Sequence, residues 1–144
     1  MEEKSIEHQL RRFLLGVAAF ILIGTIAELL LIEHYEEGLQ WLPFVFSAIG
    51  LVSIGGAWYY PTTNTLKAMR VIMGLVVLSG VVGIYIHFSR NLAFTREINP
   101  SFSLAEAILP ALKGSYPLLA PGVLFLAGIL ALAAAHRHPK LEKS

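Results

Sequence analysis

The sequence contains no cysteine among its 144 residues. Disulfide bonds, thiolate metal sites and thiol-based catalysis are therefore excluded. The chain also has little net charge, +1 at pH 7, and its basic residues stand at the ends of apolar segments. This distribution argues against nucleic acid as a partner. The motifs G-x-S-x-G and H-E-x-x-H and a glycine-rich phosphate loop are missing as well, so no familiar reaction machinery is present.

Apolar residues are what the chain has in excess: 56% of it is hydrophobic, more than a soluble core of this size requires. Four apolar runs of about 18 to 20 residues each have the length that a helix needs to cross a bilayer core of about 30 Å. They occupy residues 13–32, 42–60, 71–88 and 116–135. The sequence thus predicts an all-α fold, with residues 1–144 forming a single membrane domain, an integral membrane four-helix bundle.

Lysine and arginine set the expected orientation of the spans. Eight of them belong to the two terminal segments and the loop between the second and third runs, and three belong to the loop after the third run. Cytoplasmic segments carry the excess of Lys and Arg. Both the N and C termini are therefore predicted to be cytoplasmic, in a multi-pass protein of the cell membrane.

The longest loop, residues 89–115, is accordingly expected on the outer side. Within it Ser103 and Glu106 form a capping box, which predicts a short extra helix over residues 104–109 before Pro110 and Gly114 end it. Such a helix is expected to lie on the membrane surface or to tuck back into it. Stripes of small residues predict where the spans pack. They are Ser47, Gly50 and Ala57 in the second run, Val76, Gly80 and Gly83 in the third, and Ala127, Ala131 and Ala135 in the fourth.

Glu28 is the most informative residue of the first run. An acid inside an apolar span is costly and is usually kept for a partner, a cavity or a functional pathway. It stands five residues before Glu33, about 7 Å along a helix axis. Glu28 is therefore expected in the outer half of the membrane, where it is a candidate for proton coupling.

Polar residues gather at the outer ends of the first and third runs, which the predicted topology brings to one membrane face. One interpretation is a site for a divalent transition metal such as zinc, iron or copper, because carboxylates and imidazoles are its usual ligands. The ligands would be Glu33, His34, Glu37 and His87.

Two other interpretations of this cluster stay open. An organic or lipid ligand, or a transported proton, would use Glu28, Tyr35, Arg90, Asn91 and Glu97. Alternatively the cluster is a network of ion pairs at the interface, in which Arg90 and Arg96 neutralise the acids. A further pair, His136 and His138, has a spacing that could hold a metal, although such residues are more often solvated.

Four sequence motifs carry a resemblance to known proteins. They are EHYEEGLQWLPF at 33–44, GIYIHFSRN at 83–91, INPSFSLAE at 98–106, and SYPLLAPG at 115–122 with a closing HRHP at 136–139. In these motifs the chain resembles a group of uncharacterised small bacterial four-helix integral membrane proteins. The resemblance implies a bacterial inner membrane and brings no activity with it.

Three functions are consistent with these patterns. The first is a binding or accessory protein with an outward-facing Glu/His site for a metal, a small ligand or a partner complex. The second is a dimeric proton-coupled transporter or channel that uses Glu28. The third is a metal-dependent membrane enzyme, which is least favoured because ligands are present without reaction machinery. The expected partners are the lipid bilayer and either a second copy or a larger membrane complex.

Overall fold

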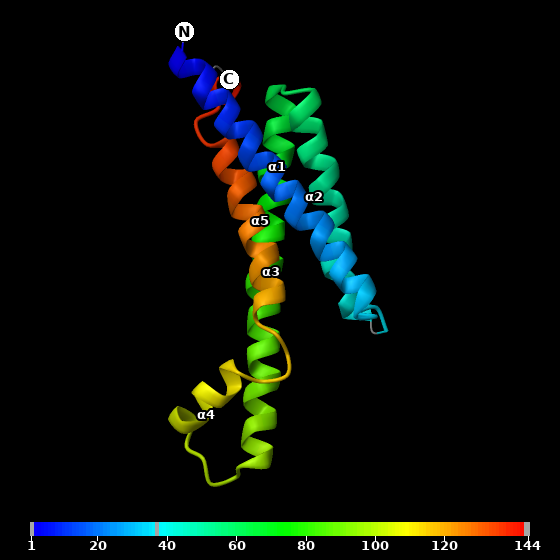
Figure 1. Ribbon diagram of the computed structural model, residues 1–144, viewed down its shortest axis with the longest axis vertical. Helices are drawn as coiled ribbons and strands as arrows, with labels where there is room; N and C mark the ends of the chain where they lie inside the picture. The colour runs from blue at the N-terminus through cyan, green and yellow to red at the C-terminus, as the bar shows by residue number, and fades with distance from the viewer. Residues whose placement is uncertain (1, 37, 143–144) are drawn as a thin grey trace.

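The computed structural model describes residues 2–36 and 38–142, and all regular structure in these ranges is helical. This confirms the prediction of an all-α fold for the described residues. Figure 1 shows the long helices running side by side, with both ends of the chain at the same end of the molecule. The elements are α1 (Glu2–Leu31), η1 (Gly38–Trp41), α2 (Leu42–Tyr59), α3 (Thr63–Ile98), α4 (Leu104–Leu112), α5 (Leu119–Ala135) and α6 (Pro139–Glu142).

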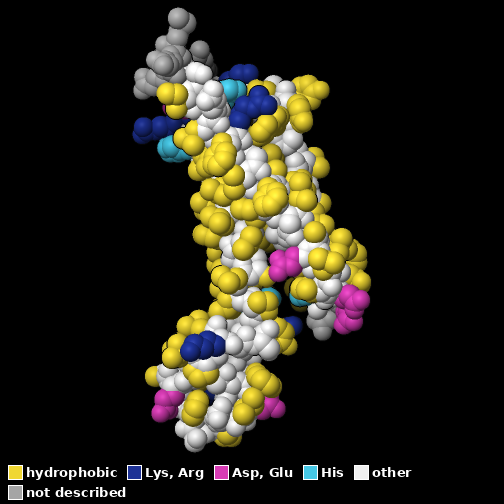
Figure 2. Space-filling view, in the orientation of Figure 1, with side chains coloured by type: hydrophobic (Ala, Val, Ile, Leu, Met, Phe, Trp, Pro, Cys, Tyr) yellow, Lys and Arg dark blue, Asp and Glu magenta, His cyan; other side chains and the backbone are white. Residues whose placement is uncertain are grey.

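Three segments of the described chain are helical, long and apolar enough to cross a membrane: Ser5–Leu31, Gly38–Tyr59 and Thr63–Ile98. The fourth predicted span corresponds to α5, a shorter apolar helix. Figure 2 shows basic side chains at the end that carries the termini and acidic side chains in the lower half of the visible face, with a mostly apolar stretch between these two levels. The molecule thus has the surface of a helical membrane protein.

The centre of the bundle is the contact between α3 and α5, which run side by side in Figure 1. On α3 the fully buried side chains include Met69, Met73 and Val76; on α5 they include Ala127 and Ala131. α1 packs on α5 and α2, and α2 packs on α3 as well. The small-residue stripes predicted on the second and fourth runs are buried, together with Val76 and Gly80 of the third, which confirms their role in packing.

Glycine allows α3 and α5 to approach this closely. A β-carbon at Gly80 would lie 2.8 Å from the backbone nitrogen of Phe125, and one at Gly128 would lie 2.6 Å from a methyl group of Val77. Backbone atoms of a packed helix cannot move aside as the end of a flexible side chain can. Any larger residue at position 80 must therefore push the two helices apart.

The third helix is longer than its apolar run, which is the main difference from the predicted boundaries. It begins at Thr63, where Thr62 and Thr65 form a capping box, and it continues ten residues beyond Phe88 to Ile98. Residues 89–98 are therefore helix and not the start of the loop 89–115. These residues include no helix breaker until Pro100, which disfavours a helical conformation at Asn99.

α4 follows as a two-turn helix whose N-terminus is the expected capping box. The Ser103 hydroxyl accepts from the Glu106 N–H, and the Glu106 carboxylate accepts from the Ser103 N–H and hydroxyl. These hydrogen bonds lower the pKa of Glu106. Pro110 does not end the helix as predicted, because its missing N–H costs only one hydrogen bond near a terminus. α4 runs on to Leu112 and buries Ala107 and Ala111.

The α3–α5 contact predicts a contrast between two glycines of the same helix. Gly80→Ala should lower the free energy of unfolding by about 1–3 kcal/mol, the usual cost of overpacking. Gly74→Ala is the matched control, because a β-carbon at position 74 meets nothing within 4 Å. Thermal unfolding of both purified variants in detergent tests this. Equal stability of the two variants would contradict the proposed contact.

Candidate functional site

The end of the molecule away from the termini is organised around Asn91 of α3. Its side chain is only 1% exposed. Asn91 Nδ2 donates to the carbonyl oxygen of Tyr116 at 2.8 Å, and the Tyr116 N–H donates to Asn91 Oδ1 at 3.0 Å. Pro117 disfavours a helical conformation at Tyr116, so these two backbone groups have no helical partner. Asn91 satisfies both and fixes the segment between α4 and α5 to α3.

Gly114 makes room for this clamp. A β-carbon at position 114 would lie 2.3 Å from the Asn91 carboxamide. The chain turns from α4 toward α5 directly against Asn91, and only a residue without a side chain can pass there. Gly114, which the sequence marks as a helix breaker, thus also allows the backbone to pass close to the Asn91 side chain.

His87 lies one helical turn before Asn91 and contacts the next residue of the same segment. Its Nδ1 is 2.7 Å from the carbonyl oxygen of Pro117. A carbonyl oxygen only accepts hydrogen bonds, so Nδ1 carries the proton and Nε2 has the lone pair when the ring is neutral. The ring of Tyr116 lies 6.0 Å from that of His87, and the Arg90 guanidinium carbon lies 5.5 Å from the Tyr116 ring. His87, Arg90 and Asn91 of α3 therefore all contact the segment at residues 116 and 117.

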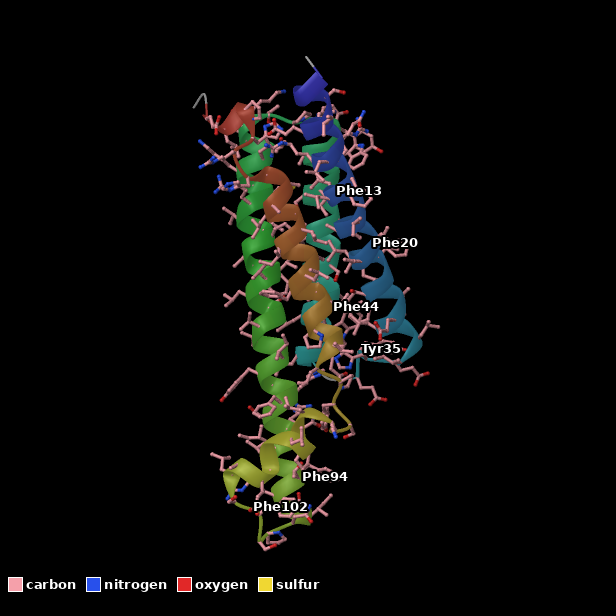
Figure 3. The ribbon with its side chains drawn as sticks, turned by 60° about the vertical axis from the view of Figure 1, so that its left-hand side comes forward. Phe13, Phe20, Tyr35, Phe44, Phe94 and Phe102 are labelled. Carbon is pink, nitrogen blue, oxygen red and sulfur yellow. The ribbon has the colours of Figure 1, made fainter. Side chains whose placement is uncertain are left out.

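The outer end of α1 is built separately. The N–H of His34 donates to the carbonyl of Leu29, and Glu33 takes a left-handed conformation with φ 52°, which is a Schellman-type helix end. The ring of Tyr35 then lies 6.4 Å from Trp41, which lies 5.5 Å from Phe44. Figure 3 shows Tyr35 and Phe44 near each other at this end of α1 and α2. This aromatic row connects the exit of α1 to η1 and α2.

The polar residues of the predicted pocket stand on different elements: Glu33 and His34 follow the end of α1, and His87 and Asn91 lie on α3. α1 packs mainly on α5 and α2, whereas α3 packs on α5, α2, α4 and α6. Glu28, Glu33 and Glu97 are exposed, while His87 and Asn91 are engaged with residues 116 and 117. His87, Arg90 and Asn91 of α3 thus gather around residues 116 and 117, and a shared site with Glu33 and His34 stays a prediction.

The metal interpretation finds no support in the described residues. No group of three or more His, Asp or Glu side chains among them is placed to hold a metal ion. One of the four proposed ligands, Glu37, lies outside the described residues. A site for zinc, iron or copper stays a prediction.

Sequence reasoning missed an apolar surface on the α3 extension and α4. Its members are apolar and exposed, and they lie outside the apolar run 71–88 of the third span. We call them the outer apolar surface. They are Phe94, Ile98, Leu104, Ile108, Leu109 and Leu112. The spacing 104, 108, 112 marks one helix face and was available in the sequence. Figure 3 shows Phe94 and Phe102 in this part of the molecule, far from the ends of α1.

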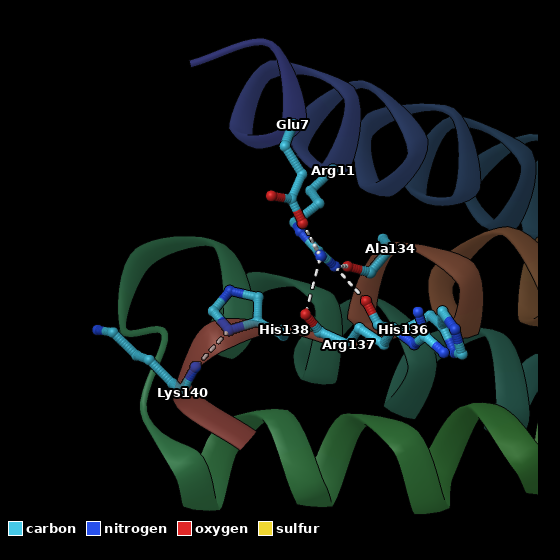
Figure 4. Close-up of polar contacts among 7 residues, drawn as sticks. All are labelled: Glu7, Arg11, Ala134, His136, Arg137, His138 and Lys140. Carbon is cyan, nitrogen blue, oxygen red and sulfur yellow. Dashed lines mark hydrogen bonds and ion pairs between the residues drawn. The ribbon is translucent and has the colours of Figure 1, made fainter. Parts of the chain in front are cut away.

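A second missed feature lies at the end of the molecule that carries the termini. Arg11 of α1 donates to the carbonyls of Ala134, His136 and Arg137 at 2.5, 2.7 and 3.1 Å, and it also pairs with Glu7 (Figure 4). The carbonyls at a helix C-terminus lack partners within the helix and carry partial negative charge. Arg11 supplies both donors and positive charge there, and thereby ties α1 to the end of α5.

No protein-family model, curated protein or solved structure matches this chain. The resemblance to small bacterial membrane proteins therefore stays a prediction.

The clamp predicts that Asn91→Ala releases the segment between α4 and α5. The substitution leaves two partly buried backbone groups of Tyr116 without partners, which costs up to about 1–3 kcal/mol. Hydrogen exchange of the Tyr116 amide should accelerate accordingly, and cleavage within residues 113–118 by an added protease should increase. Asn64→Ala, at an exposed position of the same helix, is the control and should change neither readout. Unchanged protection of Tyr116 in Asn91→Ala would refute the clamp.

Proposed function

We propose that this chain is a four-span binding or accessory protein of a bacterial inner membrane, with both termini in the cytoplasm. Its outer apolar surface binds a partner protein of the same membrane. The observation that carries the proposal is the exposure of apolar side chains on helical segments that extend beyond the apolar run of the third span.

The fourth span in this proposal is α5. It has 17 residues, Leu119–Ala135, none of them charged, and it runs along the buried face of α3. Seventeen residues are at the short end of what crosses a bilayer. Because α5 packs on a helix that itself crosses, it shares the same depth, and its preceding segment meets α3 at residues 87 and 91.

The acyl chains of the bilayer do not reach the whole of the outer apolar surface. Phe94 and Ile98 lie about 9 and 15 Å further along the axis of α3 than Phe88, at about 1.5 Å per residue. The apolar run of α3 ends at Phe88, so the tails of the bilayer do not reach Ile98. Exposed apolar patches outside the membrane usually mark protein–protein contacts, which favours a partner protein over the bilayer as the occupant.

Glu28 is a second observation that favours a partner protein, at a different place on the molecule. It is exposed on α1 inside the apolar stretch, and its carboxylate makes no hydrogen bond or ion pair to any residue that the structure describes. A carboxyl group at such a depth is stabilised by a donor or cation from outside the chain. A partner helix beside α1 supplies one. A proton path through Glu28 remains the alternative prediction.

Site-specific cross-linking in intact cells tests the proposal. Since the chain has no native cysteine, Ile98→Cys and Ile108→Cys can each carry a photoreactive benzophenone at a single position. Both should form an adduct with the same identified membrane protein, and Leu104→Glu should abolish it by placing a charge on that surface. Lys67→Cys, exposed at the opposite end of α3, is the control and should not form this adduct.

Two results would overturn the proposal. One is adducts with phospholipid alone from positions 98 and 108, which would make α4 a membrane-surface helix. The other is the same protein adduct from position 67, which would show nonspecific proximity.

A further inference from the structure

The end of the molecule near the termini contains a cavity with basic and apolar walls. Its volume is about 250 Å³. The basic and imidazole side chains that line it are His8, Arg11, Arg12, His138 and Lys140, and its apolar walls include Leu15, Trp58, Leu66 and Met69. No acidic side chain lines it among those that the structure describes. A cavity of this composition is suited to an anion that also carries apolar groups.

The charged groups of the cavity differ in how free they are to bind. Arg11 is committed to the end of α5 and to Glu7. Arg12 is exposed, and its guanidinium carbon lies 4.4 Å from the centre of the Trp58 ring, a cation–π contact that leaves its N–H groups available. Arg11 is therefore structural, whereas Arg12 is positioned to receive an anion.

His138 contributes a neutral donor. The Lys140 N–H donates to its Nδ1 at 3.2 Å, so the proton of the neutral ring is on Nε2. Burial, followed by the nearby charges of Arg11 and Lys140, lowers the pKa of His138 and favours this neutral form. The ring can donate one hydrogen bond to an oxyanion without adding charge.

An apolar groove continues from the cavity along α1. It has a volume of about 350 Å³ and is lined by Arg12, Phe13, Gly16, Val17, Phe20 and Trp58. Arg12 and Trp58 line both spaces, so the groove leads away from the basic cavity. Gly16 lines it beside Trp58, and a β-carbon there would lie 3.9 Å from the indole ring, so a larger side chain at this position would occupy the groove. The groove follows an apolar helix into the membrane, as an acyl chain does.

We propose that this cavity and groove bind an anionic phospholipid of the leaflet that faces the termini. Its phosphate lies between Arg12, Lys140 and His138, and one acyl chain lies along Gly16 beside Trp58. Basic pockets between membrane helices bind anionic lipid head groups through the same combination of charge and depth. The inference depends on the membrane placement of α1 but not on a partner at the outer apolar surface.

Native mass spectrometry of the full chain in detergent, titrated with phosphatidylglycerol, phosphatidylcholine or inorganic phosphate, tests this site. Phosphatidylglycerol should bind more tightly than phosphatidylcholine, and inorganic phosphate should not displace it. Arg12→Gln should weaken phosphatidylglycerol binding about fivefold, the expected loss for one basic side chain near a membrane surface. Arg70→Gln is the matched control, since Arg70 is exposed on α3 and does not line the cavity; it should leave the affinity unchanged.

A second pair of variants tests the acyl-chain groove. Gly16→Leu fills the groove beside Trp58 and should weaken binding of the lipid. Gly24→Leu is the control on the same helix, because a β-carbon at position 24 meets nothing within 4 Å, and it should leave binding unchanged. Circular dichroism of each variant establishes that the helices are intact.

Three results would overturn the inference: equal affinity for the two lipids, an equal loss in Arg70→Gln, or displacement by inorganic phosphate with no effect of Gly16→Leu. The last would indicate a free-anion site. The cross-linking of the outer apolar surface is unaffected by any of these outcomes, so the two proposals fail independently.

Discussion

The close contact between α3 and α5 is the interaction on which the rest of the structure depends. Helices in lipid gain little from hydrophobic exclusion, so close backbone approach and van der Waals packing must hold them together. Gly80 and Gly128 allow that approach, and the buried methionine and alanine side chains around them fill the interface. The clamp at Asn91 and the cap at Arg11 both act on the segments that enter and leave α5.

The two ends of α5 are secured by opposite chemistry. At its start a neutral amide, Asn91, pairs both backbone groups of Tyr116 in a buried position. At its end a charged guanidinium, Arg11, donates hydrogen bonds to exposed or half-buried carbonyls. A buried charge would need complete pairing, whereas at the surface water shares the cost. The burial of each site thus explains why an uncharged Asn91 stands at the start of α5 and a charged Arg11 at its end.

Hydrophobic patterning predicted the helical class and the approximate centres of the helices, because lipid-length apolar runs leave few alternatives. It placed the ends of helices less well. α3 continues through the polar residues 89–98, since hydropathy reports the membrane boundary and not the helix boundary. Pro110 was expected to end α4, but the helix tolerates it close to its C-terminus.

The candidate site was predicted only in part, for two physical reasons. Chain order does not say which helices are neighbours, so the sequence could not show that α1 packs chiefly on α5 and α2. In addition, the partners of His87 and Asn91 are backbone carbonyl and N–H groups of residues 116 and 117. Charge patterns in a sequence indicate partners among side chains, and they do not indicate partners in the main chain.

In a four-span arrangement, residues 99–103 and the turn between α2 and α3 lie on opposite sides of the membrane. The direct measurement is labelling of intact cells with a membrane-impermeant maleimide, using Ser101→Cys and Asn64→Cys in the chain that otherwise lacks cysteine. Ser101→Cys should react at once, and Asn64→Cys should react only after the membrane is permeabilised. Reaction of both positions in intact cells, or of neither, would contradict the arrangement.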